Sequence, residues 1–109
     1  MNKILSLLVS LALLASSNAH AFNVDISATP VSAGMNNAVG LMFFRIAEPQ
    51  TCINGGAIWI SLDTQGVGKG MYATVLAAIT SGRKLAYLGY SQDSGGNCYA
   101  YQVEIGGPQ

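Results

Sequence analysis

The sequence predicts a mainly β domain with one α-helix and one disulfide bond. Short apolar or alternating segments occur on both sides of a single stretch with helical periodicity. Two cysteines are present, and the N-terminus reads as an export signal. Hydrophobic residues make up 50% of the 109 residues, which suits one compact core and a single domain.

Residues 1–21 are predicted to be a cleaved secretory signal peptide. Lys3 precedes an apolar run over 4–15, and the small-x-small sequence AHA ends at Ala21. The run, at about 12 residues, is shorter than the roughly 20 that cross a membrane, so an uncleaved anchor is disfavoured. We therefore expect an exported protein, secreted or periplasmic, whose single domain spans 22–109.

The composition of the predicted domain excludes several classes of protein. It keeps four basic and five acidic side chains, and its near-neutral charge argues against a nucleic-acid partner. The only histidine, His20, belongs to the signal, which excludes Ser-His-Asp, Cys-His and histidine metal sites. The acidic residues are too dispersed for a calcium loop. We expect no enzyme activity, no metal and no cofactor.

Cys52 and Cys98 are expected to form a disulfide, because each has only the other as a partner in an exported chain. The bridge would close a loop of about 47 residues and contribute about 4 kcal/mol by restricting the unfolded chain. The alternative, a redox or nucleophilic cysteine, lacks both a CxxC motif and a histidine base.

Three strands are expected before the helix. The segment 23–29 alternates and ends at Pro30, and 31–38 reads as a turn-rich connection. The segment 39–46 is apolar on both faces, which suits a strand buried on two sides or at an oligomer contact. After a loop over 47–56, the segment 57–63 alternates again.

The periodicity changes from 2 to 3.6 residues after this third strand, and a helix is predicted over 69–81. Gly82 is placed for a left-handed C-terminal cap, with two basic residues after it. The apolar stripe that predicts the helix contains Tyr72, Val75, Leu76 and Ile79.

Two further strands are expected over 84–91 and 98–105, joined by a hairpin loop over 92–97. The resulting order, β-β-β-α-β-β, is that of the five-stranded Greek-key barrel called the OB-fold. A simple antiparallel sheet with one packed helix would give the same order. The barrel is the favoured interpretation.

A family resemblance rests on Trp59, the helix 71-MYATVLAAITSG-82, the strand 84-KLAYLGY-90 and the cysteine pair. Over about residues 52–105 the chain resembles small exported proteins similar to the B subunits of subtilase-cytotoxin-type toxins. The resemblance implies an OB-fold that forms rings and binds glycans on host surfaces. It carries no sugar-contacting residue onto positions 22–50.

The glycine-rich stretch 66-GVGKG-70 does not match a nucleotide-binding P-loop. Gly70 follows Lys69 where Ser or Thr is required, and Asp63 stands where the first glycine is required. The glycines are interpreted as a flexible entry into the helix. Lys69 stays a candidate anion contact at the helix start. Asp63 and Asp93 lie in separate loops and are expected to be solvated turn residues rather than a catalytic pair.

The aromatic residues are the main candidates for ligand binding. They lie on three predicted strands, and aromatic faces pack on sugar rings. Trp59 is the strongest candidate, because its strand turns Ile58 and Ile60 to the opposite face. For each aromatic residue the alternative is a place in the core or at a subunit contact. The candidate ligand-binding set is Trp59, Lys69, Tyr90, Tyr99 and Tyr101.

The sequence therefore predicts an exported, non-enzymatic binding module that recognises cell-surface glycans and assembles into a ring. One alternative is a periplasmic or secreted structural protein that binds a partner protein through an exposed strand edge. Another is a small inhibitor or immunity-like partner.

Overall fold

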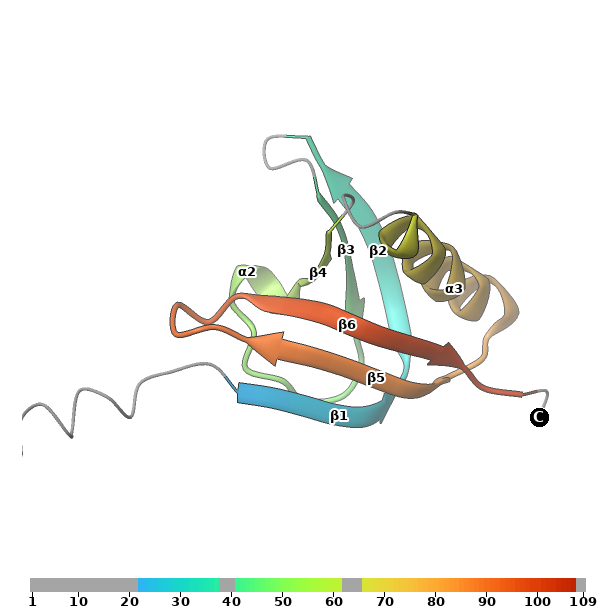
Figure 1. The fold of residues 1–109 in the computed structure, drawn as a ribbon. Helices are drawn as coiled ribbons and strands as arrows, with labels where there is room; N and C mark the ends of the chain where they lie inside the picture. The colour runs from blue at the N-terminus through green and yellow to red at the C-terminus, as the bar shows by residue number, and fades with distance from the viewer. Residues whose placement is uncertain (1–21, 38–40, 62–65, 108–109) are drawn as a thin grey trace, which may run out of the picture.

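The computed structural model describes residues 22–37, 41–61 and 66–107 (Figure 1). The predicted signal peptide, residues 1–21, lies outside the described residues. Within the described ranges, no helix is both long and apolar enough to cross a bilayer.

Six strands form one mixed sheet in the order β1-β5-β6-β4-β3-β2. The strands are β1 (Phe22–Ala28), β2 (Pro30–Asn36), β3 (Leu41–Ile46), β4 (Ile58–Ile60), β5 (Leu85–Gln92) and β6 (Cys98–Ile105). All neighbours are antiparallel except β4 and β6, which run parallel. The predicted mainly β class is confirmed. The two outermost strands, β1 and β2, are consecutive in the chain and separated only by Thr29.

The prediction of a turn-rich connection over 31–38 is wrong, because β2 runs through it to Asn36. Gly34, which favoured a turn, pairs with Phe43 of β3. A β-carbon at Gly34 would lie 2.9 Å from Cζ of the Phe43 ring. The glycine therefore makes room for an aromatic ring inside a strand, although a glycine in this stretch predicts a turn.

A carboxylate fixes the corner between β1 and β2. The Thr29 amide donates to Oε1 of Glu48 at 2.6 Å, and the Thr29 hydroxyl donates to Oε2 at 2.9 Å. The Ala47 amide closes the corner by donating to the Thr29 carbonyl. The two hydrogen bonds from Thr29 to the carboxylate, above all the one from its backbone amide, lower the pKa of Glu48.

Helix α3 (Val67–Ser81) packs against β2 and β6 at one end of the sheet (Figure 1). It contains the predicted 69–81 segment and buries Val75 and Ala78. Leu76, expected on the same stripe, is exposed. The predicted left-handed cap at Gly82 is confirmed: the amides of Gly82 and Arg83 donate back to the carbonyls of the last turn, in the pattern of a Schellman motif.

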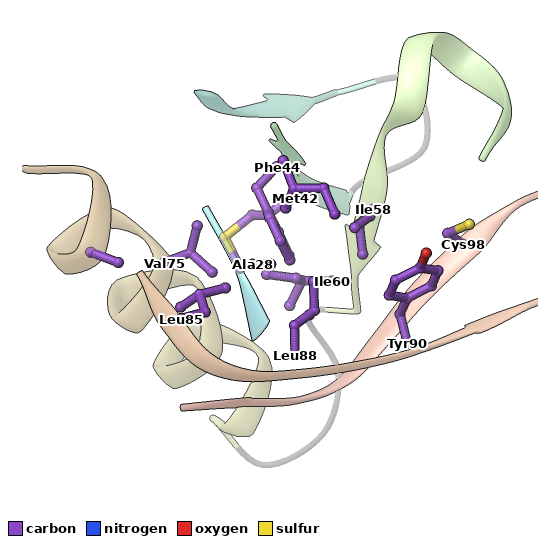
Figure 2. Close-up of a cluster of buried hydrophobic side chains, with 12 residues drawn as sticks. Ala28, Met42, Phe44, Ile58, Ile60, Val75, Leu85, Leu88, Tyr90 and Cys98 are labelled. Carbon is purple, nitrogen blue, oxygen red and sulfur yellow. The ribbon is translucent and has the colours of Figure 1, made fainter. Parts of the chain in front are cut away.

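The hydrophobic core lies between the sheet and α3 (Figure 2). Strands β3, β4 and β5 supply most of its fully buried side chains, and α3 supplies Val75. Tyr90 and Cys98 lie at the end of the cluster away from Val75. The largest side chains with almost no exposure are Phe44, Ile58, Ile60, Leu85, Leu88, Val75 and Cys98.

The predicted disulfide between Cys52 and Cys98 is confirmed, with the two Cα atoms 5.6 Å apart. It joins the start of β6 to a short helical turn, α2 (Ile53–Gly56), that precedes β4. The bridge thus holds α2 beside the parallel β4–β6 pair.

Candidate binding site

A cavity of about 280 Å³ lies between α2 and the face of β2, β3 and β4 that points away from the core. Apolar and polar side chains share its lining, with two aromatic rings, one guanidinium and two carboxamides. The lining residues are Asn36, Phe43, Arg45, Asn54, Ala57 and Trp59.

The two rings of the cavity belong to neighbouring strands. Phe43 of β3 and Trp59 of β4 are register partners, and their ring centroids lie 5.3 Å apart in an edge-to-face arrangement. Trp59 is only 9% exposed, so most of its ring is covered. The alternation of β4 turns Ile58 and Ile60 into the core and leaves Trp59 on the opposite face of the strand, as predicted, where it lines the cavity.

Arg45 is held in place on both sides. Its guanidinium carbon lies 4.9 Å from the centroid of the Phe43 ring, a cation–π contact. Its Nε donates to the Gly55 carbonyl at 3.0 Å, and its Nη2 donates to the Asn54 carbonyl at 3.2 Å. A guanidinium has five N–H donors, so these two bonds fix its position without using its hydrogen-bonding capacity up.

The acceptors of Arg45 are positioned by the disulfide region. The Ile53 amide donates to the Gly96 carbonyl at 3.0 Å, next to the Cys52–Cys98 bridge. Asn54 adopts a left-handed conformation, with φ of 60°, and its Nδ2 donates to Oδ1 of Asn97. The turn that carries the two carbonyls is therefore tied to the β5–β6 hairpin loop.

Buried Gln92 provides a second tie between these loops. The Thr51 hydroxyl donates to Oε1 of Gln92 at 2.7 Å, and Nε2 of Gln92 donates to the Thr51 carbonyl at 2.9 Å. The same Nε2 also donates to the Gly96 carbonyl at 3.3 Å. The cavity wall thus rests on a covalent bond and a satisfied polar network.

A second group of polar and aromatic residues lies on β1, β5 and β6. Tyr87 and Tyr101 both donate their hydroxyls to Oδ1 of Asp25 at 2.5 Å. The bond from Tyr101, followed by that from Tyr87, lowers the pKa of Asp25. The same carboxylate raises the pKa of both phenols, because ionising either would remove its hydrogen bond to Asp25.

The predicted ligand-binding residues are not brought to one place. Trp59 lines the cavity, and Tyr99 is its register partner on β6. Tyr101 lies in the Asp25 group. Tyr90 packs in the core at 3% exposure, and this burial raises its pKa. Tyr90 therefore has the core position that was the alternative to ligand binding for each aromatic residue. Lys69 is exposed on the first turn of α3 and does not line the cavity.

The other lining residues were not identified from the sequence. Phe43 and Arg45 lie two apart in a strand, and this spacing places them on one face. This two-residue spacing did not single out a binding face, because the whole segment is apolar on both faces. Asn36 and Asn54 reach the cavity only through the pairing of β2 and the fold of α2.

Among residues 22–37, 41–61 and 66–107, no three or more of His, Cys, Asp and Glu are grouped as metal ligands would be. Asp93 accepts hydrogen bonds from the amides of Gly95 and Asn97 and so stabilises the hairpin loop. Asp63 lies outside the described residues.

Comparisons with known families, with curated proteins and with solved structures find no match.

Proposed function

We propose that this protein is an exported, non-enzymatic module that binds a carbohydrate in the cavity over Trp59. The observation that carries the proposal is the combination of an aromatic pair with Arg45, Asn36 and Asn54 in one concave surface. Aromatic rings pack against the apolar faces of sugars, and carboxamides and guanidinium groups exchange hydrogen bonds with sugar hydroxyls. Small-ligand sites usually combine aromatic side chains with a few convergent polar groups, and this cavity has both.

The proposal includes an OB-like barrel as the architecture. If β1 and β2 are counted as one strand bent at Thr29, the sheet has five strands, with α3 between the third and the fourth. Phe43, Arg45 and Trp59 of the cavity then lie on the second and third strands, the part of OB-folds that receives oligosaccharides and oligonucleotides. The resemblance to toxin B subunits, with ring assembly and glycans as ligands, belongs to the same proposal.

A glycan array tests this function directly. We expect the oxidised wild-type protein to bind a defined subset of glycans and Trp59→Ala to lose that binding. Because Trp59 is largely buried, Arg45→Gln and Asn36→Ala provide variants that disturb the core less. Phe22→Ala, which removes an exposed aromatic ring outside the cavity, is the matched control. No signal above background on a broad array of sugars would refute the proposal.

A second candidate function, recognition of a partner protein, is favoured by the surface of β2. This outermost strand carries Val31 and Met35, which are 54% and 74% exposed. Large apolar side chains on a terminal strand suit a contact with another polypeptide. Light scattering at roughly tens of micromolar tests whether the partner is a second copy of this chain, because association raises the mass as the concentration rises. A monomeric mass there would count against ring assembly, and a larger mass abolished by Met35→Lys would support it.

A further inference from the structure

The outward surface of β1, β5 and β6 carries the carboxylate of Asp25, which two tyrosines hold through one of its oxygens. Tyr87 and Tyr101 both donate to Oδ1 of Asp25. Oδ2 accepts no hydrogen bond from any residue that the structure describes. No basic side chain of the described residues forms an ion pair with this carboxylate, and Asp25 is exposed. The group is therefore a fixed, solvent-facing hydrogen-bond acceptor.

The ring of Tyr101 is held beside this acceptor before any ligand arrives. It lies over Gly89, where a β-carbon would come within 2.5 Å of Cε2 of the ring. Its hydroxyl is bound to Asp25, yet the residue stays 45% exposed. A ring that is held by its contact with Gly89 and by its hydroxyl offers a stacking surface that loses little conformational entropy on binding.

Tyr99 connects this surface with the cavity. It is the register partner of Trp59 on β4 and of Ser91 on β5, and it is 39% exposed. Asp25 and Trp59 lie on strands three positions apart in the sheet. At about 4.8 Å per strand this is roughly 14 Å across the sheet, and the registers add three residues along β6, roughly 10 Å in the strand direction, so one sugar ring cannot reach both places.

We propose that Asp25, Tyr87 and Tyr101 form a second carbohydrate subsite, so that the ligand is an uncharged oligosaccharide extending from the cavity across Tyr99. This inference rests on the proposed function. Oδ2 of Asp25 accepts hydroxyl protons of a distal sugar, and the ring of Tyr101 packs against that sugar. The uncompensated charge of Asp25 disfavours anionic sugars at this position, because like charges repel.

A length series tests the subsite. The probes are neutral glycans that present the same terminal disaccharide alone and on backbones of up to about six units, a span that covers both places. We expect the wild-type protein to bind the longer members at least about tenfold more tightly, the gain typical of a hydrogen bond to a charged group. Asp25→Asn and Tyr101→Ala should lose this gain and still bind the disaccharide. Glu104→Gln, which removes another exposed carboxylate on β6, should keep it.

The outcomes separate the two proposals. Binding that requires Trp59 but is equal for short and long probes, or is unchanged in Asp25→Asn, overturns the second subsite alone. Absence of binding to every probe overturns the proposed function and the subsite together. Binding of tetramethylammonium that is lost in Asp25→Asn, with no effect of glycan length, would assign the surface to cations and also overturn the inference.

Discussion

The ring of Tyr101 covers the backbone of Gly89 so closely that position 89 has no room for a side chain. The two residues lie on neighbouring strands, and the pairing of β5 with β6 shifts register beside them, between Gly89 and Tyr90. The shift directs Tyr101 onto the glycine, where its hydroxyl reaches Asp25.

Replacing Gly89 by alanine is expected to displace Tyr101 and lower the free energy of unfolding by about 1–3 kcal/mol, as for other overpacked sites. Urea denaturation measures this loss. Gly107→Ala is the control, since an added β-carbon there meets nothing within 4 Å. Equal midpoints for both variants would show that the ring moves away without cost.

Removing the disulfide by Cys52→Ala with Cys98→Ala is expected to lower the free energy of unfolding by about 4 kcal/mol, because the unfolded chain without the bridge has a higher conformational entropy. Guanidinium unfolding of the double variant, and of the wild-type protein with and without reductant, measures the difference. The glycan affinity should also fall, since the bridge holds the turn that positions Arg45. An unchanged midpoint under reducing conditions would contradict this account.

Acid should destabilise the fold partly through Glu48. The pKa of Glu48 is lower in the folded protein than in the unfolded chain, so its contribution to stability is fully present above the unfolded value, about 4.5. That contribution is lost as the pH falls through the lower, folded value. We expect Glu48→Gln to reduce the slope of stability against pH below about 4. Glu104→Gln is the matched control, because its side chain accepts no hydrogen bond from the described residues. The same slope in wild type and Glu48→Gln would exclude this role.

Asp25→Asn is expected to lower the pKa of Tyr87 and Tyr101, because both phenols owe their raised pKa first to the hydrogen bond with this carboxylate. Spectroscopic titration of the tyrosines measures the change. Tyr90 serves as an internal control, since burial rather than Asp25 raises its pKa. A titration curve that is the same in both proteins would show that the Asp25 cluster does not persist in solution.

Much of the fold could be predicted from the sequence where the signal is local. The helix, its cap at Gly82 and the hairpin loop at Asp93 depend on nearby residues, and the structure confirms them. The disulfide followed from having only two cysteines. Strand β2 was missed because Gly34 favours a turn locally, and its reason for being there, the ring of Phe43, lies on another strand.

The candidate site could be predicted only in part, because most of its residues meet through contacts between different strands. Trp59 was found because alternation within one strand places it opposite the core. Phe43, Arg45 and Asn54 join it through strand register and the left-handed turn of α2, which no local pattern reveals. Tyr90 faces the core because it lies two residues after buried Leu88 on the same face of β5, a regular alternation that the ligand-binding prediction did not use.

The corner at Thr29 implies an order of assembly for the sheet. Strand β2 pairs with β3, which follows within a few residues, whereas the partner of β1 is β5, more than half the chain away. Local pairs close faster than distant ones. We therefore expect the first strand of the domain to be among the last to dock, although it leaves the ribosome before all the others. Pulsed hydrogen exchange should protect the amides of β2 and β3 before those of β1, and the reverse sequence would exclude this route.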